Sequence, residues 1–90
     1  MATEDKGEVF SFPCSYPLKV MGKNTNEFYS VVSAIVERHV TAGNEITYSA
    51  RTSKGEKYMS ITATFPAESQ EQLYALYKEL AENDLVIMTL

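Results

Sequence analysis

The chain has 90 residues, of which 44% are hydrophobic and 22% are charged, and it carries a formal net charge of −4 at neutral pH. This length predicts one domain with one core, and the lack of an apolar run of about 18 residues argues against a membrane-spanning helix. The N-terminus is acidic and has no apolar signal segment, and the single cysteine, Cys14, excludes an internal disulfide. Together these features predict a soluble, cytoplasmic protein.

The negative charge is concentrated at the C-terminal end. Residues 66–90 hold five acidic side chains against Lys78 alone, whereas the rest of the chain balances seven basic residues with seven acidic ones. An acidic half attracts nucleic acid and anionic lipid poorly, which argues against both as partners. A local basic patch elsewhere on the surface is still compatible with the sequence.

The N-terminal part begins with polar residues 1–9, which predict a disordered tail before a single domain over residues 10–90. Pro13 and Pro17 lack a ladder N–H, so this stretch predicts a lead-in segment or a sheet edge rather than a central strand. Alternation over residues 16–21 predicts the first strand, and Asn24 or Asn26 is expected to cap the helix that follows.

A helix of about 14 residues is predicted next, because apolar residues recur at steps of three and four. Gly43 suits the left-handed position after this helix. Two alternating strands over residues 45–51 and 58–65 predict a hairpin with a polar turn between them. The apolar residues of the first helix are Phe28, Val31, Val32, Ile35, Val36 and Val40.

The remaining chain predicts a helix and a strand. Ser69 and Gln72 form a capping-box pattern ahead of a second apolar stripe, which ends at Leu80. The final segment, residues 85–90, is almost continuously apolar, which predicts pairing inside the sheet or burial on both faces.

The predicted order is therefore β-α-β-β-α-β, for which the ferredoxin-like sandwich is the common arrangement. This α+β fold places two helices on one face of a four-stranded antiparallel sheet. The opposite face is expected to be open and to be the place, together with the sheet edges, where a function resides. It would carry Lys19, Met21, Tyr58, Ser60, Thr62 and Thr64.

The residue pattern predicts no catalytic, metal or cofactor site. Cys14 and His39 are the only cysteine and histidine, and nothing in the sequence brings them together or supplies a third group to orient the histidine. The acidic residues lack the spacing of a cation-binding loop, and Ser53-Lys54-Gly55 matches a hairpin turn better than a phosphate loop. RNA recognition on a sheet needs aromatic residues that stack on the bases, and Tyr58 is the only one predicted on the open face. The acidic domain also argues against RNA binding.

Several short segments, taken together, resemble the small bacterial YbeD family. They are Phe12-Pro13, Lys19-Val20-Met21-Gly22, residues 36–39, Ser53-Lys54-Gly55 with Tyr58 and Ser60, residues 72–80, and Val86 with Leu90. The resemblance spans residues 10–90 and implies the ferredoxin-like fold, with a shape similar to ACT-type regulatory domains. Amino-acid-binding ACT domains have a glycine-rich loop where this chain has only Gly22 before Lys23. The family provides no catalytic residues to carry over.

The leading hypothesis is a non-enzymatic regulatory or protein-interaction module that acts through the open sheet face or an edge strand. An ACT-like small-molecule sensor is the alternative and predicts a homodimer, and RNA binding is the third. The partner is thus an unknown protein or a small ligand. The candidate interaction residues are Lys19, Met21, Gly22, Lys54, Gly55 and Tyr58.

Overall fold

The computed structural model describes residues 12–89, so the tail predicted for residues 1–9 lies outside the described part. The predicted β-α-β-β-α-β order is confirmed. Among these residues no helix is long and apolar enough to cross a membrane. The elements are β2 (Cys14–Lys23), α1 (Asn26–His39), β3 (Thr47–Thr52), β4 (Tyr58–Ala67), α2 (Gln70–Ala81) and β5 (Val86–Thr89).

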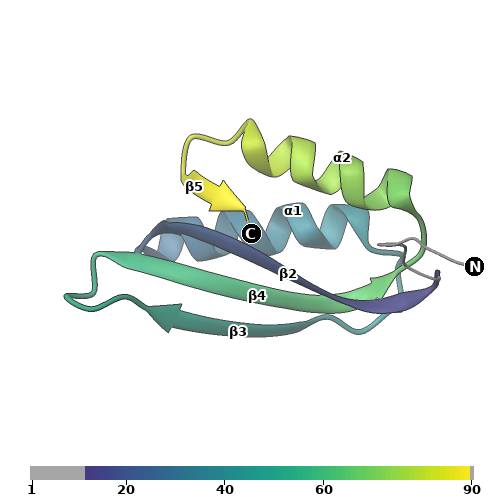
Figure 1. The fold of residues 1–90 in the computed structure, drawn as a ribbon, viewed down its shortest axis with the longest axis horizontal. Coiled ribbons are helices and arrows are strands. Elements are labelled where there is room, and N and C mark those ends of the chain that lie inside the picture. Colours follow the sequence, from purple (N-terminus) through teal and green to yellow (C-terminus); the bar gives the residue numbers. More distant parts are fainter. Residues whose placement is uncertain (1–11, 90) are drawn as a thin grey trace, which may run out of the picture.

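The strands form one antiparallel sheet in the order β3-β4-β2-β5, as the ferredoxin-like prediction requires. Both helices lie on the same side of this sheet, and the turn between β3 and β4 projects beyond the other strands (Figure 1). Neither α1 nor α2, the helices of the described residues, covers the other face of the sheet, which we call the open face.

β2 is longer than the predicted strand, and the interpretation of its start as a lead-in segment is wrong, because it pairs with β4. The alternative, a sheet edge, is confirmed there, since residues 14–19 pair with β4 alone among the described strands. β2 lies between β4 and β5 and pairs with β4 over its whole length, including Pro17 opposite Thr64. Proline is tolerated there because β5 pairs with β2 only at residues 20–22. Pro17 lies beyond that stretch, where its missing N–H costs no bond to β5.

The prediction that the C-terminal strand lies inside the sheet or is buried on both faces is also wrong. β5 is the last strand in the order and pairs with β2 alone among the described strands. The side chains of Ile87 and Met88 are 51% and 47% exposed. The apolar composition of β5 therefore does not indicate a central strand, because β5 lies at one side of the sheet and exposes two of its apolar side chains.

The helix caps differ in part from the predicted ones. Thr25, not Asn24 or Asn26, caps α1, because its Oγ1 accepts a hydrogen bond of 3.0 Å from the N–H of Phe28. Ser69 caps α2 as predicted and accepts a hydrogen bond of 3.0 Å from the N–H of Gln72.

Gly43, predicted at the left-handed end of the first helix, lies in a separate turn instead. α1 ends at His39 and its C-cap, Val40, has an extended backbone. Gly43 has φ +93° within a turn that the N–H of Asn44 closes by donating to the carbonyl of Thr41. The positive φ is therefore required by this turn and not by the helix end.

The core lies between the sheet and the two helices. Inward-facing residues of β2 and β4 meet the apolar stripes of α1 and α2, as the two periodicities predict. The largest fully buried side chains are those of Phe28, Phe65, Leu18, Ile61, Leu76, Leu80, Val20, Val32 and Val36.

Gly22 lies in a closely packed part of this layer. A Cβ atom built at Gly22 would lie 2.3 Å from Cε1 of Phe28 and 2.6 Å from the carbonyl oxygen of Leu85. The backbone of β2 can approach α1 and the segment before β5 this closely only because position 22 has no side chain.

Candidate functional site

The open face carries a hollow of about 570 Å³. Three of the sequence-predicted candidates, Lys19, Met21 and Tyr58, line it. The side chain of Tyr58 is 43% exposed. The other lining residues come mainly from β3 and β4 and are Ser49, Arg51, Thr52, Ser53, Met59, Ser60 and Thr62.

Strand register explains how these side chains come together. Thr62 of β4 pairs with Lys19 of β2 on one side and with Ser49 of β3 on the other. Ser60, two residues along β4, pairs in the same way with Met21 and Arg51. Because directly paired residues share a face, each of these rows crosses three strands on the open face.

The remaining three candidates lie elsewhere. Gly22 is buried on the helix side of β2, where it packs against Phe28. Lys54 and Gly55 lie at the exposed turn between β3 and β4, with Gly55 at φ +85°. The structure therefore brings Lys19, Met21 and Tyr58 together and separates them from Gly22, Lys54 and Gly55.

The end of the hollow next to this turn is held by a hydrogen-bond network. The N–H of Tyr58 donates to Ser53 Oγ at 3.1 Å, which closes the turn. The segment before α1 joins it, since the Asn24 N–H donates to the carbonyl of Lys57 and its Nδ2 donates to that of Glu56. The turn is thus connected both to its own hairpin and to the β2–α1 connection.

Charge is divided between the two layers of the domain. The four strands contain no aspartate or glutamate, and their only charged residues are Lys19, Lys23 and Arg51. Lys19 and Arg51 line the hollow, and Lys23 follows Met21 by two residues on the same strand face. The sequence analysis did not identify this separation, because it compared the charge of successive parts of the chain. Comparing the charges of the strands with those of the helices would have revealed it.

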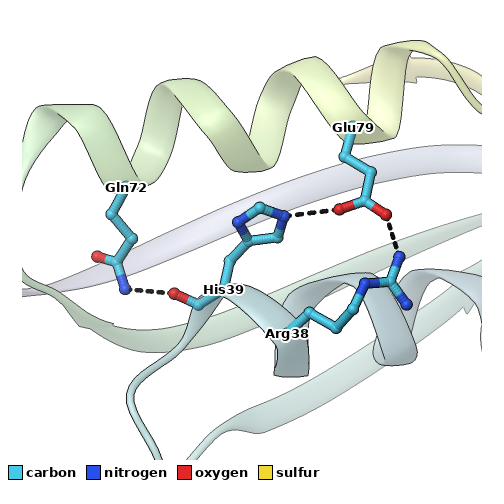
Figure 2. Close-up of polar contacts among 4 residues, drawn as sticks. All are labelled: Arg38, His39, Gln72 and Glu79. Carbon is cyan, nitrogen blue, oxygen red and sulfur yellow. Dashed lines mark hydrogen bonds and ion pairs between the residues drawn. The ribbon is translucent and has the colours of Figure 1, made fainter.

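A second polar cluster joins the C-terminal end of α1 to α2 (Figure 2). His39 Nε2 lies 2.7 Å from Glu79 Oε1, and Arg38 forms an ion pair with the other oxygen of the same carboxylate. Gln72 Nε2 donates to the carbonyl of His39 at 2.7 Å. Gln72 also accepts from the N–H of Glu68 through Oε1, so its side chain ties the start of α2 to the end of α1.

Glu79 is therefore the group that orients His39, which sequence reasoning did not identify. The two residues are 40 positions apart and meet because α1 and α2 pack side by side. Cys14 lies at the start of β2 and pairs with Ala67 on β4, on different elements from this cluster. Within residues 12–89, no group of three or more His, Cys, Asp or Glu side chains is placed to hold a metal ion.

The His39 and Arg38 contacts give stability a defined pH dependence. The hydrogen bond to His39, followed by that to Arg38, holds the pKa of Glu79 below its ordinary value of 4.5. A carboxyl group whose pKa is lower in the folded state stabilises the fold above its unfolded pKa. That contribution is lost as the pH falls through the lowered folded value.

Replacing Glu79 with glutamine should therefore reduce the loss of stability as the pH falls below the ordinary pKa of 4.5. Urea unfolding of both proteins, followed by circular dichroism across that pH range, measures the difference. Glu37→Gln removes one carboxylate from the exposed side of α1 and controls for net charge. If Glu79→Gln and the parent lose stability in parallel, the cluster contributes nothing to acid sensitivity.

Two tyrosines have raised pKa values because they are partly buried. Burial, with smaller effects from Glu37 and Tyr29, raises the pKa of Tyr48 to about 12. Burial also raises the pKa of Tyr77, together with a hydrogen bond of 2.7 Å between its hydroxyl and that of Tyr16. Both phenols therefore stay neutral at physiological pH and act as packing and hydrogen-bonding groups.

The sheet order and the two helices on one face define a ferredoxin-like α+β domain. Solved structures show the same fold: the solution structure of protein HP0495 from H. pylori superposes with a TM-score of 0.76 at 19% identity. That match covers 94% of this chain and 89% of that protein.

Residues 7–90 match the family model described as "Protein of unknown function (DUF493)", and the chain belongs to this family. It is 35% identical to a UPF0250 protein of Chromobacterium violaceum over 98% of this chain and 99% of the relative. It is 39% identical to a UPF0250 protein of Vibrio cholerae over 92% of this chain and 88% of the relative. The resemblance to the YbeD family is thereby confirmed.

Proposed function

We propose that this protein is a non-enzymatic regulatory or protein-interaction module of the cytoplasm, which binds its partner through the open face of the sheet. The observation that carries the proposal is the hollow on that face, bordered by Lys19 and Arg51. In a domain with a net charge of −4, this is a surface whose strands supply positive charge only. Such a local excess of one sign favours a partner of the opposite sign.

The floor of the hollow also suits binding. It combines hydroxyl groups of Ser49, Ser60 and Thr62 with the side chains of Met21 and Tyr58. Hydroxyl groups both donate and accept hydrogen bonds, and methionine and tyrosine provide adaptable apolar contact area. This mixture of polar and apolar groups is typical of surfaces that bind another molecule.

The non-enzymatic part of the proposal rests on how the chain uses its two most reactive side chains. The imidazole of His39 is held by Glu79 in a contact between the two helices, and Cys14 lies on the sheet. Neither lines the hollow. The residues that do line it bind and orient groups more readily than they transfer protons at neutral pH.

An ACT-like small-molecule sensor is the second candidate. The volume of the hollow falls within the roughly 300–1,000 Å³ that small-ligand sites occupy. This candidate predicts a homodimer and a rise in melting temperature with the right metabolite, because a ligand that binds the native state stabilises it. A thermal-shift screen over amino acids and related anions tests it.

The leading proposal is tested by photo-crosslinking in cells that express the full chain. A benzophenone amino acid replaces Tyr58 in one variant and Tyr74 in the other. Tyr74 is the matched control, because it is 72% exposed but lies on α2, in the opposite layer. We expect a discrete crosslinked partner from position 58 and none of the same mass from position 74.

Equal crosslinking from both positions would contradict binding through the open face. So would crosslinks from position 74 alone, since they would place the partner on the helices. A product from position 58 with twice the mass of the chain would indicate a second copy and would support the homodimer of the sensor candidate.

A further inference from the structure

Resting on the proposed function, we infer that the partner presents an acidic peptide segment, held between Lys19 and Arg51 over the hydroxyl-lined floor of the hollow. Lys19 extends from β2 and Arg51 from β3, on either side of β4. The occupant is thus identified by its charge and its extended shape.

The positions of the two cations fit an extended chain. Lys19 is level with Thr62 and Arg51 is level with Ser60, so the two lie two strands apart and are offset by two residues. From ordinary strand spacing and rise, their backbones are about 12 Å apart. An extended segment spans that distance in about four residues, so carboxylates at its two ends can reach both cations.

The charge around the hollow favours the same occupant. Lys23 continues the positive charge along β2, and Lys54 and Lys57 add to it at the β3–β4 turn. Glu56 is the one acidic residue of that turn, and its backbone carbonyl accepts a hydrogen bond from Asn24. The carboxylates of α1 and α2 belong to the opposite layer, so they do not neutralise the open face. Glu45, which precedes β3, lines a different hollow with Thr47 and Thr64 and not the one between Lys19 and Arg51.

The chemistry of the floor favours peptide over the other anions. RNA recognition on a sheet depends on several exposed aromatic rings, and Tyr58 is the one ring that lines this hollow. A small metabolite is usually enclosed by its pocket, whereas this hollow lies on the sheet face that neither α1 nor α2 covers. Hydroxyl side chains pair well with peptide groups and with carboxylates, which an acidic segment supplies together.

The inference is tested with the full chain, labelled with ¹⁵N, and a deca-glutamate peptide as the probe. Amide shifts are followed by NMR at low and at physiological salt. We expect saturable shifts at Lys19, Arg51 and Ser60 that weaken as salt rises. Lys19→Glu and Arg51→Glu, made singly, should each weaken binding about fivefold. Lys19→Gln and Arg51→Gln should weaken it less, because they remove a positive charge without adding a negative one.

Lys78→Glu is the matched control, because it makes the same charge change on the exposed surface of α2. We expect it to leave peptide binding unchanged. An equal loss with Lys78→Glu would overturn the inference by showing that only net charge matters. A deca-uridylate that binds more tightly than the peptide at the same salt, or free glutamate that gives the same shifts at equal carboxylate concentration, would overturn it in favour of RNA or a small anion.

The two proposals fail in different ways. If position 58 crosslinks a partner in cells but deca-glutamate gives no saturable amide shifts, the open face binds something other than an acidic segment, and only the present inference fails. If deca-glutamate shifts the amides of the hollow but position 58 crosslinks nothing in cells, the inferred chemistry stands and the proposed interaction module does not.

Discussion

Replacing Gly22 with alanine is expected to lower the free energy of unfolding by about 3 kcal/mol. The added methyl group would lie 2.3 Å and 2.5 Å from two ring carbons of Phe28 and 2.6 Å from the Leu85 carbonyl oxygen. Because Phe28 is fully buried and the third neighbour is backbone, neither can move away without disturbing the core. Urea unfolding followed by circular dichroism measures the change.

Gly43→Ala is the control for this substitution. Gly43 has φ +93°, but a Cβ atom added there would meet no other atom within 4 Å, so alanine should cost only about 1 kcal/mol through backbone strain. Combining Gly22→Ala with Phe28→Leu should recover part of the lost stability, since leucine lacks the ring carbons that the methyl group meets. Equal losses at positions 22 and 43 would show that close packing around Gly22 does not limit stability.

Leu76→Ala is expected to lower the free energy of unfolding by about 3 kcal/mol. Leu76 is fully buried on the inner side of α2, where it belongs to the core shared with the sheet. Removing its branched end takes apolar contacts from the core and leaves a cavity that the surrounding elements fill only in part. Thermal and urea unfolding both report the loss.

Tyr74 provides the comparison on the same helix. Its side chain is 72% exposed, so Tyr74→Ala removes a larger side chain from the outer side of the helix at a cost below about 1 kcal/mol. A Leu76→Ala protein as stable as Tyr74→Ala would mean that α2 does not contribute its inner face to the core.

Element order and core were predictable because they depend on local periodicity. The three- and four-residue steps from Phe28 to Val40 and the alternation that buries Ile61, Ala63 and Phe65 place the same residues in the core of the structure. Once the six elements are known, right-handed crossovers and short connections allow few arrangements of them. The order of the strands in the sheet could therefore be predicted as well. The Ser69 cap was predictable for the same reason, since its partner is three residues away.

The errors arose where a residue's position depends on distant parts of the chain. The apolar run at the C-terminus reads as a central strand, although the predicted ferredoxin-like order already puts the last strand at one side of the sheet, where β5 lies. Thr25 displaced two asparagines as the cap because the side chain of Asn24 instead bonds to the carbonyl of Glu56, 32 residues away. Sequence composition treats all three residues as good caps.

The candidate site was predictable in part. Alternation alone put Lys19, Met21 and Tyr58 on the open face, whereas the contribution of Arg51 required the register between β3 and β4. Gly22 is also among the predicted interaction residues, but strand alternation turns that position toward Phe28 and away from the open face. The contact between His39 and Glu79 depends on how two helices are rotated against each other, which neither helix determines by itself.

The division of charge between the layers means that the domain has an electric dipole directed from its helices to its sheet. The net charge of −4 predicts adsorption to a positively charged resin, and among the described residues the carboxylates belong mostly to the helices and their flanking turns. On such a resin the molecule would lie with its helices down and its sheet toward the solvent. The same dipole would turn the sheet face of the domain toward an anionic partner that approaches from solution. The domain would therefore be oriented for binding before the two molecules touch.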